Sequence, residues 1–131
     1  MNKIKSIALL LLFTTLSTVV SAQKYEMILF SGDYHCCQAD LWETFEKTVA
    51  EIAKKSIKNK NFEFRIVKVS DKSKKQLIDA LGGEPQKLIL RDIQSPNKVI
   101  DMSEFARAFL RNNDRTAFEK AIKEKFNEIR K

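Results

Sequence analysis

The sequence has few of the residues on which most catalytic sites depend. Its 131 residues include one histidine, three glycines and two prolines. With a single histidine and no Gly-x-Ser-x-Gly pattern, a hydrolase triad has little support. The three glycines form neither a phosphate-binding loop nor a dinucleotide fingerprint. These absences leave the two cysteines, Cys36 and Cys37, as the residues to which chemistry is most readily assigned.

The chain also lacks a strong excess of charge. It has 24 basic and 17 acidic residues, a formal net charge of +7, and two of the lysines lie in the first 22 residues. The remaining chain then carries a net charge of +5, which we interpret as a solvated exterior. We expect no nucleic-acid partner, and no motif predicts a cofactor.

The amino terminus has the pattern of a secretory signal peptide. Lys3 and Lys5 precede an apolar run over 7–13, and small residues at Val20 to Ala22 suit a signal peptidase. The run is interrupted by threonine and serine and is too short to span a bilayer comfortably. We therefore expect a signal peptide over 1–22, cleavage before Gln23, no stable membrane anchor, and a mature chain of 23–131 in the periplasm or the medium.

The two cysteines are adjacent, which argues against a structural cross-link. Neighbouring Cα atoms are about 3.8 Å apart across a trans peptide, below the range of roughly 4.4–6.8 Å usual for a disulfide. A vicinal disulfide between Cys36 and Cys37 is strained and closes no useful loop. The pair is therefore predicted to be reactive or packed.

The residues around the cysteines indicate a strand, a short loop and a helix. The apolar run 27–30 predicts a buried strand, 31–33 a polar turn, and 38–55 a helix. His35, Cys36 and Cys37 lie between them. Backbone N–H groups at the start of a helix favour negative charge, so a thiol placed there tends to have a larger thiolate fraction.

Within the predicted helix, Leu41, Phe45, Val49 and Ile52 form an apolar stripe, and Glu46 is expected on an outer face. The single tryptophan, Trp42, is interpreted as core or as a half-buried cover. In the next strand, 62–69, the alternation of apolar and charged residues shifts at Val67. That shift indicates a bulge or an end buried on both faces.

The rest of the chain predicts an alternation of helices and strands. A short helix over 72–81 is capped by Ser70-Asp71 and ended by Gly82-Gly83. Strands over 87–90 and 98–100 form an antiparallel hairpin. Closing helices begin with caps at Ser103 and Asp114. The order is β-α-β-α-β-β-α, with the first two strands parallel because a helix connects them.

This α/β order resembles the thioredoxin fold, a four-stranded mixed sheet with helices on both faces. A cysteine lies where the first strand meets the first helix, as in that superfamily. Pro85 lies before the third strand, where the resemblance implies a cis-proline opposite the thiol. The segment Phe30 to Ala39, FSGDYHCCQA, is similar to F-H-G-x-x-R-C-x-T-C of small exported ArsF-type proteins named as nitroreductase subunits. Residues 99–110 and the closing helix are also similar to that family.

The sequence departs from the family at the second cysteine. Thioredoxin-like enzymes carry C-x-x-C, and here the second position falls at Ala39 or, in the other register, at Asp40. On a regular helix Cys37 would point about 100° away from Cys36. Its access to a disulfide formed by Cys36 is therefore in question.

Three hypotheses follow from the residues and the resemblance. The first is thiol-disulfide exchange or electron transfer, with Cys36 as nucleophile, Cys37 or an outside thiol as resolving group, and His35 and Pro85 in support. Its partners would be protein thiols or disulfides, or a redox partner protein. The second is a non-catalytic binding module that uses the groove near Pro85. The third is capture of Cu(I) or As(III) by His35, Cys36 and Cys37.

Overall fold

The sheet is assembled around β1 (Tyr25–Ser31), in which all seven residues are buried. The structure is a computed structural model that describes residues 24–131. β1 pairs in parallel with β2 (Phe62–Lys68) on one side and antiparallel with β3 (Leu88–Asp92) on the other. A strand with neighbours on both sides and layers above and below is typically a continuous apolar run, as residues 27–30 are.

The fourth strand, β4 (Val99–Asp101), pairs antiparallel with β3 and completes a mixed sheet in the order β2-β1-β3-β4. The parallel pair β1 and β2 is joined by a helical crossover, because parallel neighbours cannot be joined by a tight turn. The predicted hairpin is confirmed, with its turn over residues 93–98.

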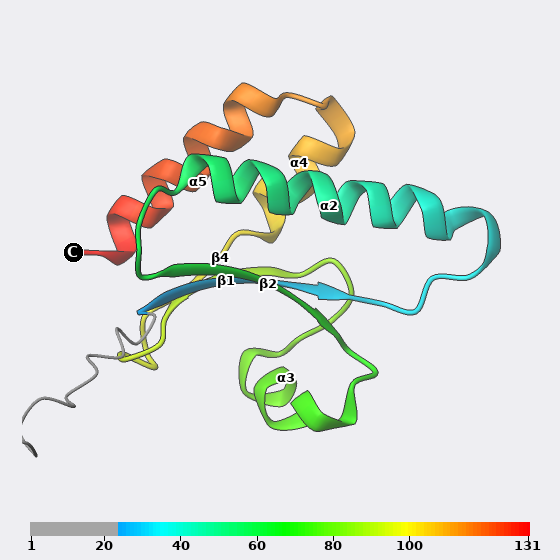
Figure 1. Ribbon diagram of the computed structural model, residues 1–131, viewed down its shortest axis with the longest axis horizontal. Coiled ribbons are helices and arrows are strands. Elements are labelled where there is room, and N and C mark those ends of the chain that lie inside the picture. Colours follow the sequence, from blue (N-terminus) through cyan, green and yellow to red (C-terminus); the bar gives the residue numbers. More distant parts are fainter. Residues whose placement is uncertain (1–23) are drawn as a thin grey trace, which may run out of the picture.

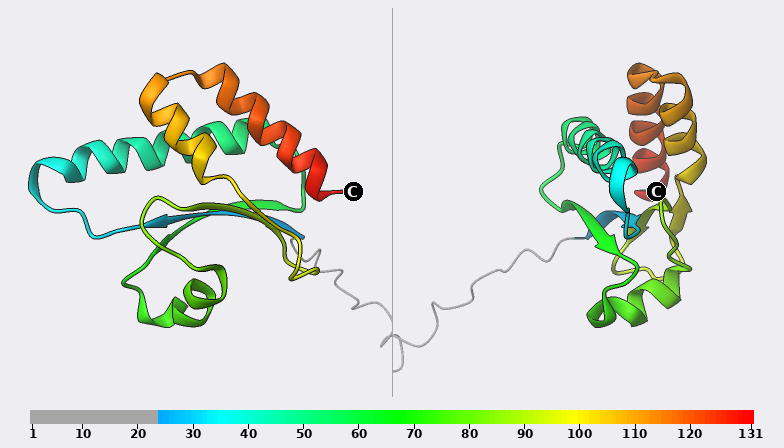
Figure 2. Two further views of the ribbon diagram at one scale, coloured as in Figure 1. Left: turned by 180° about the vertical axis from the view of Figure 1, so that it is seen from behind. Right: turned by 90° about the vertical axis from the view of Figure 1, so that its right-hand side faces the viewer.

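Helices cover both faces of this sheet (Figures 1 and 2). On one face lie α2 (Ala39–Ser56), α4 (Ser103–Asn112) and α5 (Arg115–Ile129). On the other lies α3 (Lys75–Leu81), preceded by the 3₁₀ turn η2 (Lys72–Lys74). A second 3₁₀ turn, η1 (Cys36–Gln38), leads into α2. The predicted thioredoxin-like α/β architecture, with a four-stranded mixed sheet and helices on both faces, is confirmed.

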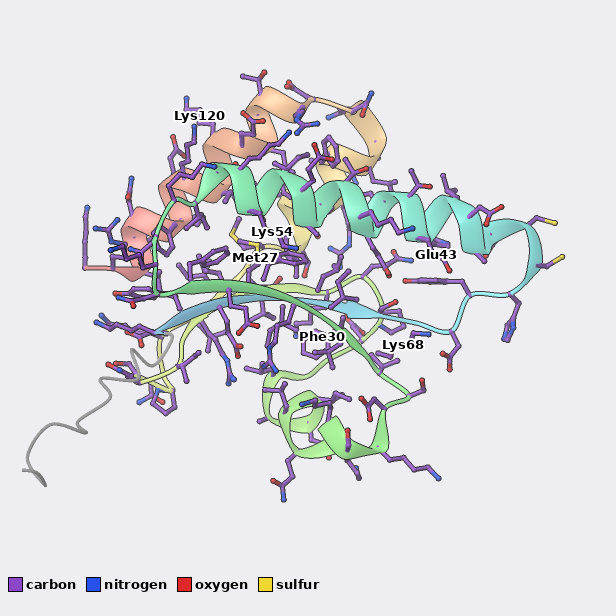
Figure 3. The ribbon with its side chains drawn as sticks, viewed as in Figure 1. Met27, Phe30, Glu43, Lys54, Lys68 and Lys120 are labelled. Atoms are coloured by element: carbon purple, nitrogen blue, oxygen red, sulfur yellow. The ribbon has the colours of Figure 1, made fainter. Side chains whose placement is uncertain are left out.

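The alternation of β1 side chains divides the core into two unequal parts. Met27 and Leu29 point into the large core beneath α2, α4 and α5, whereas Ile28 and Phe30 point toward α3. Figure 3 shows Met27 and Phe30 on opposite sides of the sheet. The smaller core consists of five buried residues, Ile28, Phe30, Val67, Ile78 and Ile89.

Two predictions about α2 are wrong. Leu41, expected on the buried stripe, is 60% exposed, and Glu46, expected outside, is only 8% exposed. The first turn of α2 extends past the end of the sheet (Figure 1), so Leu41 has no layer against which to pack. The predicted role of Trp42 is confirmed, because it is half-buried and packs against the large core.

The predicted bulge in the second strand is also wrong, since β1 and β2 pair in unbroken register from Tyr25–Phe62 to Ser31–Lys68. The backbone alternates regularly, and the apolar pattern shifts because the buried side of β2 changes from Phe64 in the large core to Val67 in the smaller one. The end of the strand is not buried on both faces either, since Ile66 is 43% exposed.

Arg65, the charged residue on the α3 face, forms an ion pair with Glu26, with Nη2 and Oε2 2.9 Å apart. The Glu26 side chain is only 3% exposed. Arg91 on β3 approaches the same carboxylate at 2.5 Å. One buried acid is thus held by two arginines.

The predicted caps at Asp71 and Asp114 are confirmed, since each side chain accepts a hydrogen bond from a backbone N–H in the following turn. Gly82 ends α3 with a φ of 59°, a conformation that favours glycine. Ser103, however, is not a cap. Its hydroxyl accepts a hydrogen bond from the Leu88 N–H at 3.1 Å and so joins α4 to β3.

The predicted signal peptide and its cleavage before Gln23 lie outside the described residues. Within residues 24–131, no helix has the length and apolar character needed to cross a membrane.

Candidate functional site

The cysteines follow directly from the carboxyl end of the central strand. β1 ends at Ser31, Gly32 is still buried, and from Asp33 the chain leaves the body of the protein. Gly32 is constrained by close approach, because a Cβ at this position would lie 3.1 Å from Pro85 Cγ. The chain therefore passes against Pro85 before it reaches the thiols.

Cys36 and Cys37 lie on the loop and 3₁₀ turn that join β1 to α2, at the right-hand end of Figure 1. Both are exposed free cysteines. Their sulfur atoms are 3.5 Å apart, a distance at which one thiol donates a hydrogen bond to the other. The structure therefore brings together the two residues predicted to carry the chemistry.

The contact between the sulfurs depends on the backbone of Cys36. Its φ is 55°, in the left-handed region that non-glycine residues seldom adopt. Because Cys36 lies outside the regular helix, the separation of about 100° between successive helical residues does not apply. The expectation that Cys37 would point away from Cys36 is wrong for this reason.

His35 directly precedes the thiols, in extended backbone at the start of η1. Its side chain is exposed and does not cap the turn. The structure therefore places His35 next to Cys36 in the chain, in contact with solvent. Its role in support of the Cys36 thiolate stays a prediction.

Pro85 lies on the neighbouring turn between α3 and β3, but the cis-proline implied by the resemblance is wrong. All peptide bonds in residues 24–131 are trans. The Lys87 N–H donates to the Glu84 carbonyl at 3.1 Å, and Gln86 has a φ of 72°. A trans proline followed by a residue of positive φ is typical of a type II turn. That turn brings Pro85 against Gly32 without a cis bond.

An aromatic contact, which the sequence did not predict, attaches the thiol loop to the core. The Tyr34 ring stacks on Trp42 with centroids 5.4 Å apart, and Trp42 meets Phe45 edge-on at 6.1 Å. Such pairs stabilise by about 0.5–1.5 kcal/mol beyond the area that they bury. The loop is therefore anchored two residues before Cys36, while the thiols themselves stay exposed.

Two polar groups without hydrogen-bond partners lie beneath this anchor. They are the Tyr34 hydroxyl and Glu46 Oε1, both buried. Burial raises the pKa of Tyr34, and the negative charge of Glu46 raises it further. Because the helical pattern predicts an outer position for Glu46, no local signal in the sequence indicates this buried pair.

The hypothesis of a metal site receives no support from the geometry. Within residues 24–131, no group of three or more histidine, cysteine or acidic side chains is arranged to hold an ion. His35, Cys36 and Cys37 are consecutive, and three consecutive residues rarely direct all their donors to one point.

Comparisons with known proteins found no matching family model, no matching curated protein and no matching solved structure. The resemblance to thioredoxin-like and ArsF-type proteins therefore stays a prediction. The function has to be argued from the site itself.

Proposed function

We propose that this protein is an exported thiol-disulfide redox protein whose reaction takes place at Cys36 and Cys37. The observation that supports it best is the 3.5 Å contact between two exposed sulfur atoms at the end of the central strand. The proposed location, in the periplasm or the medium, rests on the signal-peptide pattern of residues 1–22.

The proposed reaction begins with the thiolate of Cys36, which attacks one sulfur of a disulfide in a partner protein. The partner's S–S bond breaks, a mixed disulfide forms, and the leaving sulfur takes up a proton. Cys37 then attacks the Cys36 sulfur of the mixed disulfide and releases the second partner thiol. Two electrons and two protons pass to the partner, and Cys36 and Cys37 are left as a vicinal disulfide. The reverse sequence reduces Cys36 and Cys37 and oxidises the partner.

The exposure of the thiols supports this proposal over a packing role. A buried cysteine behaves as a small apolar residue, whereas a reactive cysteine must be reached by its partner. Neither Cys36 nor Cys37 belongs to either apolar core. The Tyr34–Trp42 stack fixes the loop without covering the thiols, as a site that receives a macromolecular disulfide requires.

One observation favours a second candidate, the non-catalytic binding module. Pro85 is trans and exposed. The cis-proline opposite the thiol, which the thioredoxin resemblance implies for a catalytic site, is therefore absent here. In a binding module, Pro85 and the neighbouring loop would contact a partner without exchange of electrons.

Trapping of mixed disulfides distinguishes these two functions. The chain with Cys37→Ser keeps the proposed nucleophile but cannot resolve its mixed disulfide, so it should accumulate covalent complexes in the exported compartment. The chain with Cys36→Ser should form none, and the double variant serves as the control. Complexes are separated without reductant after acid quenching and identified by mass spectrometry.

Absence of complexes from both single variants would contradict the redox function and favour the binding module. Equal trapping by both would leave a redox function but overturn the assignment of Cys36 as the nucleophile.

A further inference from the structure

The two ends of α2 carry opposite charge. Glu43 lies near its amino end and Lys54 near its carboxyl end, and Figure 3 shows the two far apart along the helix. We use the name thiol tip for residues 33–44, which comprise the loop after β1, η1 and the start of α2. The thiol tip contains three acidic residues and no lysine or arginine, although the whole chain is basic.

The acids of the thiol tip are exposed and uncompensated. Asp33, Asp40 and Glu43 are all exposed, and none forms an ion pair with any residue in the described part of the chain. Asp33 accepts a hydrogen bond from the Ser70 hydroxyl at 3.2 Å, which leaves its charge in place. By contrast, Glu51 further along α2 pairs with Lys55 at 2.8 Å.

Three sources of positive charge lie near the acids of the thiol tip: the amino end of α2, the exposed Lys47 one turn after Glu43, and the lysines near Asp33. None of these lysines forms an ion pair with an acid of the tip within residues 24–131. The dipole of α2 offsets Asp40, but this effect falls off within the first turn, before Glu43. Lys68 ends β2 and Lys72 lies on the connection to α3, which reaches the thiol tip where Ser70 hydrogen-bonds Asp33. Asp40 and Glu43 lie on the other side of the thiols in the chain, so the negative charge next to the cysteines stays.

The thiol tip also carries one large, highly exposed apolar side chain. Leu41 is 60% exposed on the first turn of α2, between Asp40 and Trp42. Protein interfaces commonly combine an apolar centre with a polar rim, and complementary charge favours the right partner over others. The thiols, Leu41 and the acids thus occupy one continuous stretch of the chain.

From this arrangement we propose that the thiol pair exchanges preferentially with disulfides flanked by positive charge, that is, with a partner whose lysines or arginines lie beside its cysteines. The proposal rests on the proposed redox function and adds the class of partner. A negative field at the site raises the local concentration of cationic partners and lowers that of anionic ones. The bond changes are those of the exchange reaction described above.

Three small disulfides that differ in charge serve as probes. Cystamine carries two positive charges, bis(2-hydroxyethyl) disulfide is neutral, and 3,3′-dithiodipropionate carries two negative charges. The rate of loss of the protein thiols is measured with each on the mature chain at low and at high salt. Each rate is divided by that of 2-mercaptoethanol with the same probe, which removes differences in the reagents' own reactivity.

At low salt we expect the normalised rate to be highest with cystamine, intermediate with the neutral disulfide and lowest with 3,3′-dithiodipropionate. The highest and lowest rates should differ by about tenfold or more. In about 1 M salt the Debye length falls to about 3 Å, so the spread should shrink to about twofold. The double variant Asp40→Asn/Glu43→Gln should lose most of the preference at low salt. The matched control is Glu124→Gln/Glu128→Gln on α5, which makes the same change in net charge far from the thiols. This control should keep the preference for cystamine.

The outcomes separate this proposal from the function on which it rests. If the thiols react with none of the probes under conditions in which 2-mercaptoethanol does, the redox function itself fails. If they react with equal normalised rates, or if both double variants change the preference equally, the redox function stands and the cationic partner is wrong.

Discussion

β1 and the loop that follows it are consecutive in the chain and opposite in their surroundings. Every residue of β1 is buried, with neighbours on two sides and a core on each face. From Asp33 the chain is exposed, and five residues after the strand ends Cys36 adopts a left-handed backbone. The acids of this region form no ion pairs within residues 24–131. Stability and chemistry therefore depend on two adjacent segments of the chain. The strand holds the fold, and the loop presents the thiols.

The largest expected effect comes from a pair of leucines in these two regions. Leu29 on β1 is fully buried, and Leu41 in the thiol tip is 60% exposed. Leu29→Ala should lower the free energy of unfolding by about 2–5 kcal/mol, because it removes buried contacts and leaves a cavity. Leu41→Ala should change it by less than about 0.5 kcal/mol. Urea denaturation measures both, and similar losses for the two variants would break the comparison.

Two glutamates give the next largest contrast. Glu26→Gln on β1 leaves Arg65 and Arg91 without their shared carboxylate, and should cost about 1–3 kcal/mol because those guanidinium groups are only partly exposed. Glu43→Gln in the thiol tip has no ion pair to lose and should leave the urea midpoint almost unchanged. A Glu26→Gln protein as stable as the parent would show that the ion pairs of Glu26 with Arg65 and Arg91 contribute little to stability.

A smaller effect is expected at the cap of α5. The Asp114 side chain accepts a hydrogen bond from the Ala117 N–H at 3.0 Å. Asp114→Ala should lower the free energy of unfolding by about 1 kcal/mol. Asp114→Ser should keep most of the stabilisation by the cap, because serine is also a good N-cap residue. Neither substitution should alter the rate of thiol alkylation. A change in that rate would show that the helical layer and the thiol loop are coupled.

The smallest effect at neutral pH is expected at Tyr34, where the two regions join. Burial and the charge of Glu46 raise the pKa of Tyr34, so the folded state holds its proton to higher pH than the unfolded state. Stability should therefore fall as pH rises above about 10, the ordinary pKa of tyrosine. Tyr34→Phe should be close to the parent at pH 7 and lose less stability above pH 10. Thermal melts across pH 7 to 11 measure this, and parallel curves for the two proteins would contradict it.

The sequence predicted the fold well, because its signals were local and repeated. The apolar run at 27–30, the caps at Asp71 and Asp114 and the glycine at Gly82 all lie where the structure places them. The predictions that were wrong concern tertiary contact. Periodicity along α2 could not show that the sheet ends before Leu41. It also could not show that Glu46 lies beneath the loop that Tyr34 anchors.

The site was predicted in its residues but not in its geometry. Adjacent cysteines after a buried strand are visible in the sequence, whereas the left-handed backbone that brings their sulfurs to 3.5 Å is not. The same holds for Pro85, for which the resemblance implied a cis bond opposite the thiol, whereas the structure places it against Gly32 with a trans bond. Backbone conformation at single non-glycine residues is set by their surroundings, and no local pattern reports it.

The most direct test of the redox function is the intact mass of the mature protein, alkylated without reductant before and after exposure to bis(2-hydroxyethyl) disulfide. The proposed function predicts that exposure converts the monomer to a form with two fewer alkyl groups, the vicinal disulfide, and that reductant restores both. Two alkyl groups on the monomer before and after exposure would mean that the thiols do not exchange, and would contradict it.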